Sequence, residues 1–237
     1  MSSLTLIRHG QATFYKDHYD ELSSLGQKQA TALGKYMLEA EMRFDAVYSG
    51  PLKRQKQTQS LVQEVFSEKR VSYPEAVLLD EFEEHSGPQA VRRAALELTE
   101  RDEAYRSFAA PVKSWSAETR KKYFTFFEKF MLEWSRGELG YDDVESWQTF
   151  RARVERGVKR VLNDHQRGKR VAVFTSAGPI AATLAYVLGL ENGKTMETSW
   201  VIRNASFSEF LFTQNRITLL AHNQVPHLKT DGMRTYV

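Results

Sequence analysis

The stretch Leu4-Thr5-Leu6-Ile7-Arg8-His9-Gly10 decides the fold class, because its apolar run stops abruptly at an arginine and a histidine. Short apolar runs of this kind are typical of buried strands rather than of helices. A polar loop follows, and then Ser23 or Ser24 is a candidate N-cap, with Gln27 three positions after Ser24 as a capping box requires. The apolar residues after this cap recur at helical spacing: Ala30, Leu33, Met37 and Ala40.

The alternation of strand and helix continues along the chain. Phe44 to Tyr48 predicts a second strand, and a helix follows from about Leu52 to Val65. Near the far end, Arg170 to Thr175 is the strongest predicted strand, followed by an apolar helix over Ile180 to Leu188. The last predicted strands, 206–213 and 217–222, form a hairpin. This order of elements indicates an α/β layered fold.

Composition excludes several classes of protein. The 237 residues contain no cysteine, which rules out a disulfide scaffold, a thiolate zinc site and a cysteine nucleophile. The net charge of +3 is too small to indicate a nucleic-acid or membrane partner. The N-terminus lacks the pattern of a signal peptide, and no apolar run approaches the roughly 20 residues of a membrane span. We therefore expect a cytoplasmic protein with a single domain over residues 1–237.

A segment of different character, at about residues 87–140, interrupts the alternation. It is rich in lysine, arginine and aromatic residues. Its aromatic residues recur at helical spacing and so form one stripe: Tyr123, Phe126, Phe127, Phe130 and Trp134. Such a stripe is most often a packing face, and the alternative is that it serves a homodimer. We expect a helical cap inserted into the core domain.

Two polar clusters with arginine follow predicted strands, at the sheet edge where α/β proteins bind ligands. In Arg8-His9-Gly10, a guanidinium could hold an anionic phosphate against the histidine. The alternative is a buried, hydrogen-bonded histidine. The second cluster, residues 49–58, places Arg54 at a helix start, where positive charge opposes the macrodipole. An anion bound between Arg54 and the helix N-terminus would account for it.

A third cluster, Asp80-Glu81-Phe82-Glu83-Glu84-His85, likewise lies at the C-terminal end of a predicted strand, after the apolar residues 77–79. Without context it is a solvated acidic loop. Beside phosphate-binding arginines, one of its carboxyl groups could instead protonate a leaving oxygen.

The residues of these clusters carry a resemblance to a known family. Leu6-Ile7-Arg8-His9-Gly10-Gln11 resembles the opening motif of the histidine phosphatase superfamily, the phosphoglycerate mutase-like proteins. Four further stretches are similar to later motifs of that family and occur in the family's order: 22–30, 48–58, 145–154 and 223–228. Only the segment at about 87–140 is left unaccounted for.

The resemblance implies a three-layer α/β/α sandwich with a mostly parallel central sheet, and phosphoryl transfer through a phosphohistidine. His9 corresponds to the nucleophile, and Arg8 and Arg54 to the residues that bind the phosphoryl oxygens. Glu81 lies where the family places its general acid, although Glu83 and Glu84 are close alternatives. The chemistry requires no metal and no cofactor.

The chain departs from the family at Ser176, which stands where a second histidine is usual. A serine hydroxyl can donate one hydrogen bond to a phosphoryl oxygen but brings no charge. Losing a charge-assisted donor costs about two or three orders of magnitude in rate, by analogy with an oxyanion hole. Two compensations are open. The N-terminal amides of the helix beginning near Gly178 could bind phosphate together with Ser176, or His85 or a basic residue of the insertion could take the place of the missing histidine.

These observations predict a phosphatase that hydrolyses a phosphoric monoester, either a small phosphorylated metabolite or a phosphoprotein. Phosphoglycerate mutase activity is an alternative, since the basic insertion could hold a second anionic group. A weak or inactive relative that binds a phosphorylated ligand or a protein partner is the other, and Ser176 favours it. The intact set of Arg8, His9, Arg54 and Glu81 favours the enzyme.

Overall fold

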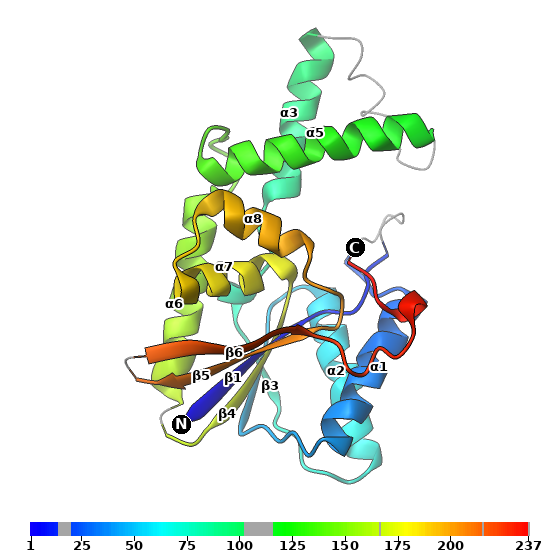
Figure 1. Cartoon of the computed structure of the whole chain (residues 1–237), viewed down its shortest axis with the longest axis vertical. Coiled ribbons are helices and arrows are strands. Elements are labelled where there is room, and N and C mark those ends of the chain that lie inside the picture. The colour runs from blue at the N-terminus through cyan, green and yellow to red at the C-terminus, as the bar shows by residue number, and fades with distance from the viewer. Residues whose placement is uncertain (14–19, 102–115, 166, 215, 237) are drawn as a thin grey trace.

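The computed structural model describes residues 1–13, 20–101, 116–165, 167–214 and 216–236, and shows a sheet with helices on both faces (Figure 1). The strands are β1 (Ser2–Arg8), β2 (Ala46–Ser49), β3 (Ala76–Leu78), β4 (Arg170–Thr175), β5 (Phe207–Thr213) and β6 (Arg216–Gln224). The helices are α1 (Ser24–Glu39), α2 (Lys53–Glu68), α3 (Gly87–Arg101), α5 (Ala117–Arg136), α6 (Trp147–Asp164), α7 (Ala177–Leu188) and α8 (Asn192–Trp200), with the 3-10 helices η1 (Asp80–Phe82) and η4 (Asp231–Met233).

The six strands form one mixed sheet in the order β3-β2-β4-β1-β5-β6. Strands β1 to β4 pair in parallel, whereas β5 pairs antiparallel with both β1 and β6. The strands β2, β4 and β1, each followed by a polar cluster or Ser176, are therefore neighbours. The α/β fold class with a mostly parallel central sheet is confirmed.

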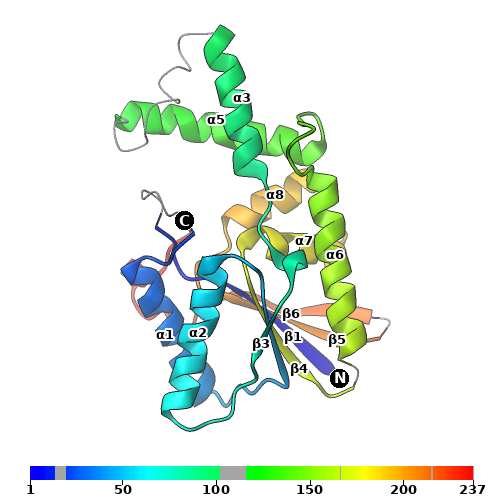
Figure 2. The same ribbon diagram turned by 180° about the vertical axis from the view of Figure 1, so that it is seen from behind.

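Neighbouring residues of a strand face opposite sides of the sheet, and this alternation separates two cores. Leu6 of β1 is fully buried in a cluster with residues of α6 and α7. Ile7, the next residue, is fully buried with residues of α1 and α2. Figure 2 shows these two pairs of helices on opposite sides of the sheet. Burial on both faces is why β1 and β4 are continuously apolar rather than alternating in sequence.

Of the two candidate N-caps of α1, the structure uses the first rather than Ser24, the position from which Gln27 would complete a capping box. Ser23 is the N-cap, and its Oγ accepts a hydrogen bond from the Gly26 amide at 3.0 Å. The turn around Gly26 packs directly on the chain after β1: a Cβ on Gly10 would lie 2.4 Å from the Gly26 carbonyl oxygen. Glycine at both positions thus lets the loop after His9 lie against the first turn of α1.

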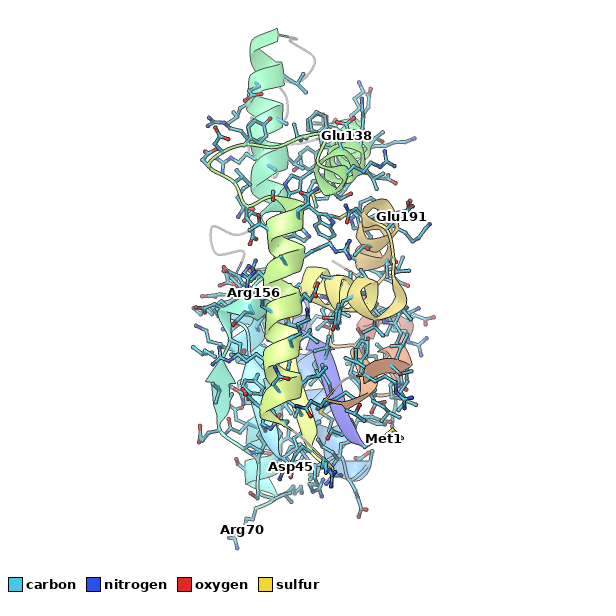
Figure 3. All side chains as sticks on the ribbon, turned by 90° about the vertical axis from the view of Figure 1, so that its left-hand side faces the viewer. Met1, Asp45, Arg70, Glu138, Arg156 and Glu191 are labelled. Atoms are coloured by element: carbon cyan, nitrogen blue, oxygen red, sulfur yellow. The ribbon has the colours of Figure 1, made fainter. Side chains whose placement is uncertain are left out.

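The segment at 87–140 contains α3 and α5, which lie beyond α8 at one end of the molecule (Figure 1). Figure 3 shows Asp45, just before β2, at the opposite end from Glu138, just after α5. Of the predicted stripe, Phe126 and Trp134 of α5 are buried in the core, and Tyr123, Phe127 and Phe130 are partly buried and pack against it. The predicted aromatic stripe is therefore a packing face along its length. Residues 102–115 of this segment lie outside the described residues. The single-domain organisation stays a prediction.

None of the helices in the described part of the chain is both long and apolar enough to cross a membrane.

Candidate active site

The predicted site residues of three segments meet at the carboxyl edge of the sheet. Arg8 ends β1 and His9 directly follows it, Arg54 lies in the first turn of α2 after β2, and Ser176 follows β4. The side chains of these four residues are buried, with residue exposures of 9%, 5%, 6% and 0%. Buried polar groups of this kind require defined partners.

His9 is fixed on both its backbone and its ring. The His9 amide donates to the Thr175 carbonyl of β4 at 2.9 Å, and its carbonyl accepts from the Ala205 amide at 3.0 Å. The ring Nδ1 lies 2.7 Å from the Gly10 carbonyl oxygen, which can only accept, so Nδ1 carries the hydrogen. Arg54 Nε donates to the ring Nε2 at 3.0 Å. Nε2 therefore presents a lone pair toward the guanidinium of Arg54.

Burial and neighbouring charges keep this imidazole neutral. Desolvation lowers the pKa of His9 well below its ordinary value of 6.5, the positive charges of Arg54 and then Arg8 lower it further, and the bond to Gly10 opposes them. An imidazolium would also direct an Nε2 hydrogen at the Arg54 donor. A neutral ring, with an unprotonated Nε2, is the form that attacks phosphorus.

This protonation state is directly measurable. We expect the His9 ring to remain the neutral Nδ1–H tautomer at pH 6, where histidine in a peptide, with a pKa of about 6.5, is mostly protonated. Long-range nitrogen–proton NMR correlations of the ring distinguish this tautomer from the cation. A His9 ring that titrates near pH 6.5 would contradict the geometry described above.

Arg54 is held by a carboxylate of the chain itself. Its Nη1 lies 3.0 Å from Asp20 Oδ1, and Asp20 Oδ2 accepts from the Lys53 amide at 2.7 Å. Asp20 thus occupies the first turn of α2, where a negative group is favourable. The anion expected between Arg54 and the helix N-terminus is therefore present in the folded chain as a side chain. Its effect is to orient the guanidinium before any ligand binds.

Arg8 lies at the end of β1 between β4 and β5. Its Nη1 donates to the Ile202 carbonyl oxygen, in the segment between α8 and β5. The guanidinium is close enough to lower the pKa of His9 by its charge. Two buried arginines thus flank one neutral imidazole, an arrangement that attracts a phosphoryl group.

Ser176 is fully buried and is the N-cap of α7, although its side chain makes no capping bond. Its Oγ accepts a hydrogen bond from Gln55 Nε2 at 2.9 Å. Sequence reasoning missed Gln55, although a signal exists. The buried face of α2 runs through Gln55, Thr58 and Gln59 before it becomes apolar at Val62. Polar residues on the buried stripe of a helix need buried partners.

The acidic cluster separates into carboxylates with different surroundings. Glu81 lies 3.4 Å from Arg160 Nη1 of α6, and its stem packs where a Cβ on Gly157 would be 2.6 Å away. Glu83 is exposed. Glu84 instead turns to the start of α7, where its Oε2 accepts from the Gly178 amide at 3.4 Å. The carboxylate beside the Ser176 turn is thus that of Glu84, whereas Glu81 faces α6.

His85 does not fill the place of the missing histidine. Its ring lies among three aromatic rings, with centroid distances of 5.3 Å to Trp134, 6.0 Å to Trp147 and 5.5 Å to Phe150. The Gly87 amide donates to its Nδ1 at 3.2 Å, so Nε2 carries the hydrogen, and Nε2 lies 3.6 Å from Glu84 Oε1. His85 therefore faces Glu84 rather than the phosphoryl site.

The helix α7 offers few amides to a phosphate. The Gly178 amide faces Glu84, and Pro179 has no N–H to donate. The compensation by helix amides expected from the sequence is therefore limited, because an acidic side chain already lies at this helix N-terminus.

His227 is a core residue rather than a site residue. It lies 6.1 Å from the Tyr36 ring and stacks on Phe207 at 6.5 Å between centroids. Burial lowers the pKa of His227 to about 4.

This shift predicts acid sensitivity of the fold. The unfolded chain takes up a proton near pH 6.5 whereas the folded chain resists it until about pH 4, so stability falls as the pH drops through this window. We expect a loss of about 3 kcal/mol of unfolding free energy from His227 between pH 7 and pH 4. Urea unfolding of wild type and His227→Phe at both pH values measures it. An equal pH dependence in the two proteins would contradict this expectation.

Within the described residues, no group of three or more histidine, aspartate or glutamate side chains is placed to hold a metal ion.

The fold and the site define a protein with a neutral histidine between two arginines at the carboxyl edge of an α/β/α sandwich. The model of the histidine phosphatase superfamily (branch 1) matches residues 4–225, so the chain belongs to this superfamily. The resemblance of the sequence motifs is thereby confirmed. A search of curated proteins gave no match.

Solved structures share the fold at low sequence identity. A phosphoserine phosphatase from Entamoeba histolytica, in complex with 3-phosphoglyceric acid, is 18% identical with a TM-score of 0.63, covering 96% of this chain and 100% of that one. A putative alpha-ribazole-5'-P phosphatase from Escherichia coli is 20% identical with a TM-score of 0.62, covering 94% and 96%. A mycobacterial glucosyl-3-phosphoglycerate phosphatase is 18% identical with a TM-score of 0.62, covering 93% and 98%. At these identities the likeness establishes the fold.

Proposed function

We propose that the protein is a phosphomonoesterase that transfers the phosphoryl group of its substrate to His9 and then to water. The observation that carries this proposal is the state of the His9 ring. Its Nδ1 donates to the Gly10 carbonyl oxygen at 2.7 Å, and its Nε2 accepts a hydrogen bond from Arg54 Nε at 3.0 Å. A nucleophilic nitrogen and a phosphate-binding donor thus lie at hydrogen-bond distance from each other.

The first half-reaction uses the groups in place. The phosphoryl oxygens of the substrate accept the hydrogen bond that Arg54 Nε otherwise donates to His9 Nε2. The Nε2 lone pair can then attack phosphorus. The bond between phosphorus and the leaving oxygen breaks, and Glu84 in its protonated form gives that oxygen a proton. The products of this step are the alcohol, a phosphohistidine and the Glu84 carboxylate.

The second half-reaction restores the enzyme. The Glu84 carboxylate accepts a proton from water while the water oxygen attacks phosphorus, and the phosphorus–Nε2 bond breaks. Phosphate leaves, His9 is neutral again and Glu84 is protonated again. Over the cycle one phosphomonoester and one water give one alcohol and one phosphate. Arg8 and Arg54 balance the negative charge of the oxygens throughout.

The substrate class follows from the charges at the site. Two arginines are matched to one phosphoryl dianion, which favours a phosphomonoester of a small metabolite or of a protein side chain. The three structural relatives named above are phosphatases by name, which agrees with this class.

The test is a comparison of wild type with His9→Ala on p-nitrophenyl phosphate and a panel of sugar and glycerate phosphates. We expect turnover that disappears in the variant. His165→Ala is the matched control, because His165 follows α6, where its Nε2 lies 2.8 Å from Tyr48 Oη, and its loss should leave activity unchanged. Wild type as inert as His9→Ala on every ester, while phosphate still binds, would favour a phosphate-binding relative instead.

A further inference from the structure

Gln55 is a fully buried amide whose orientation is fixed by its partners. Its Oε1 accepts from the Leu52 amide at 3.1 Å, and its Nε2 donates to the Phe82 carbonyl oxygen at 3.1 Å. A carbonyl can only accept and an amide N–H can only donate, so the side chain cannot be turned over without losing both bonds. The second Nε2 hydrogen is therefore directed at Ser176 Oγ, 2.9 Å away.

This orientation determines where the Ser176 hydrogen points. Because Ser176 Oγ accepts from Gln55, its own hydrogen must be directed away from Gln55. Among the described residues this hydrogen meets no acceptor, and the hydroxyl does not cap α7. Ser176 directly follows Thr175, whose carbonyl oxygen accepts a hydrogen bond from the His9 amide at 2.9 Å. The serine donor thus lies next to the residue that anchors the nucleophile.

We propose that Gln55 is a positioning residue that holds the Ser176 hydroxyl so that it donates to the phosphoryl group, and that the two form one uncharged unit in place of a second histidine. The inference rests on the proposed function and adds a residue to it. Gln55 acts through Ser176 and does not itself touch substrate. The unit supplies a fixed donor without the charge of an imidazolium, and Arg8 and Arg54 supply the charge.

The same geometry limits what can replace Ser176. The Gln55 amide nitrogen is 2.9 Å from Ser176 Oγ, so the volume that an imidazole would need is filled. A histidine at position 176 would displace Gln55 and break its bonds to Phe82 and Leu52.

A double-mutant cycle separates positioning from a structural role. We expect Gln55→Met to lower kcat by roughly 10-fold, with a smaller effect on KM, since second-sphere partners typically contribute 10- to 100-fold. We expect Ser176→Ala to lower kcat by about 100-fold. Because Gln55 acts through the serine, Gln55→Met should cause no further loss in the Ser176→Ala background. The matched control is Gln59→Met, on the same helix and 5% exposed, whose amide bonds to Gln63.

The outcomes decide the proposal. Losses that multiply in the double variant would overturn it, because Gln55 would then act through the Phe82 carbonyl and the η1 segment. An unchanged kcat in Gln55→Met would also overturn it. If wild type has no turnover and does not bind inorganic phosphate in calorimetry, the proposed function itself fails and this inference fails with it. Activity in wild type that depends on His9 but not on the Gln55–Ser176 pair contradicts the inference alone.

A second pair of variants tests the filled volume by a gain of activity, which misfolding cannot produce. We expect Ser176→His to have a lower kcat than wild type, and Gln55→Ala/Ser176→His to exceed Ser176→His by about 10-fold, because alanine makes room for the imidazole. A Ser176→His variant that matches or exceeds the double variant would overturn the inference that Gln55 fills this place.

Discussion

Arg54→Ala is expected to lower kcat/KM by about a thousand-fold, through loss of a charge-assisted donor to the phosphoryl group in the transition state. Arg54 is 6% exposed and donates to His9 Nε2 at 3.0 Å, so its removal also leaves the nucleophile without its partner. The folded structure should persist, because Asp20 retains its bond to the Lys53 amide at 2.7 Å. Steady-state kinetics on p-nitrophenyl phosphate measure the effect.

The neighbouring residue provides the control for charge alone. Lys53 carries the same charge, but its side chain is 55% exposed and pairs with Glu21. We expect Lys53→Ala to change kcat/KM by less than about threefold, because exposed charges are screened by solvent. Equal losses in Lys53→Ala and Arg54→Ala would contradict a specific role for Arg54.

Glu84→Gln is expected to lower kcat by about 10²–10⁴-fold for alkyl phosphates, whose leaving alcohols need a proton. The loss should be much smaller for p-nitrophenyl phosphate, because p-nitrophenolate leaves without one. We assign this role to Glu84 because its carboxylate lies at the start of α7, with Oε2 3.4 Å from the Gly178 amide. Rates for a series of esters with different leaving groups test the difference.

Glu81→Gln is the matched variant in the same segment. Glu81 pairs with the half-exposed Arg160 of α6, and this pair is expected to contribute less than about 1 kcal/mol to stability. We therefore expect Glu81→Gln to retain wild-type kcat for both kinds of ester. A leaving-group-dependent loss in Glu81→Gln, with Glu84→Gln unaffected, would restore the assignment implied by the family resemblance.

Much of the fold follows from local signals in the sequence. The strands that became β1 and β4 are apolar runs closed by polar residues, since both of their faces are covered by helices. β3 is different: it forms one edge of the sheet, where Val77 and Leu78 are each 53% exposed. Its short, half-exposed run therefore gives a weak strand signal in the sequence.

The site was predicted where single motifs carry it and missed where distant segments meet. Arg8 and His9 stand together in one motif. By contrast, the contact of Asp20 with Arg54 joins positions 34 residues apart, and that of Gln55 with Ser176 joins positions 121 apart. The choice between Glu81 and Glu84 depends on which side of η1 faces α6 and which faces α7. Such contacts depend on how elements pack, which one sequence does not encode locally.

The central claim is that His9 carries the phosphoryl group, and trapping of the phosphoenzyme tests it most directly. Wild type is mixed with a ³²P-labelled phosphomonoester and quenched within one turnover, and the protein-bound label is followed in acid and in alkali. We predict a label that is labile in acid, stable in alkali and absent from His9→Ala, as expected for a phosphorus–nitrogen bond. A label that is stable in acid and labile in alkali would indicate a serine ester, and substrate consumed with no bound label would indicate direct attack by water; either result would contradict the account.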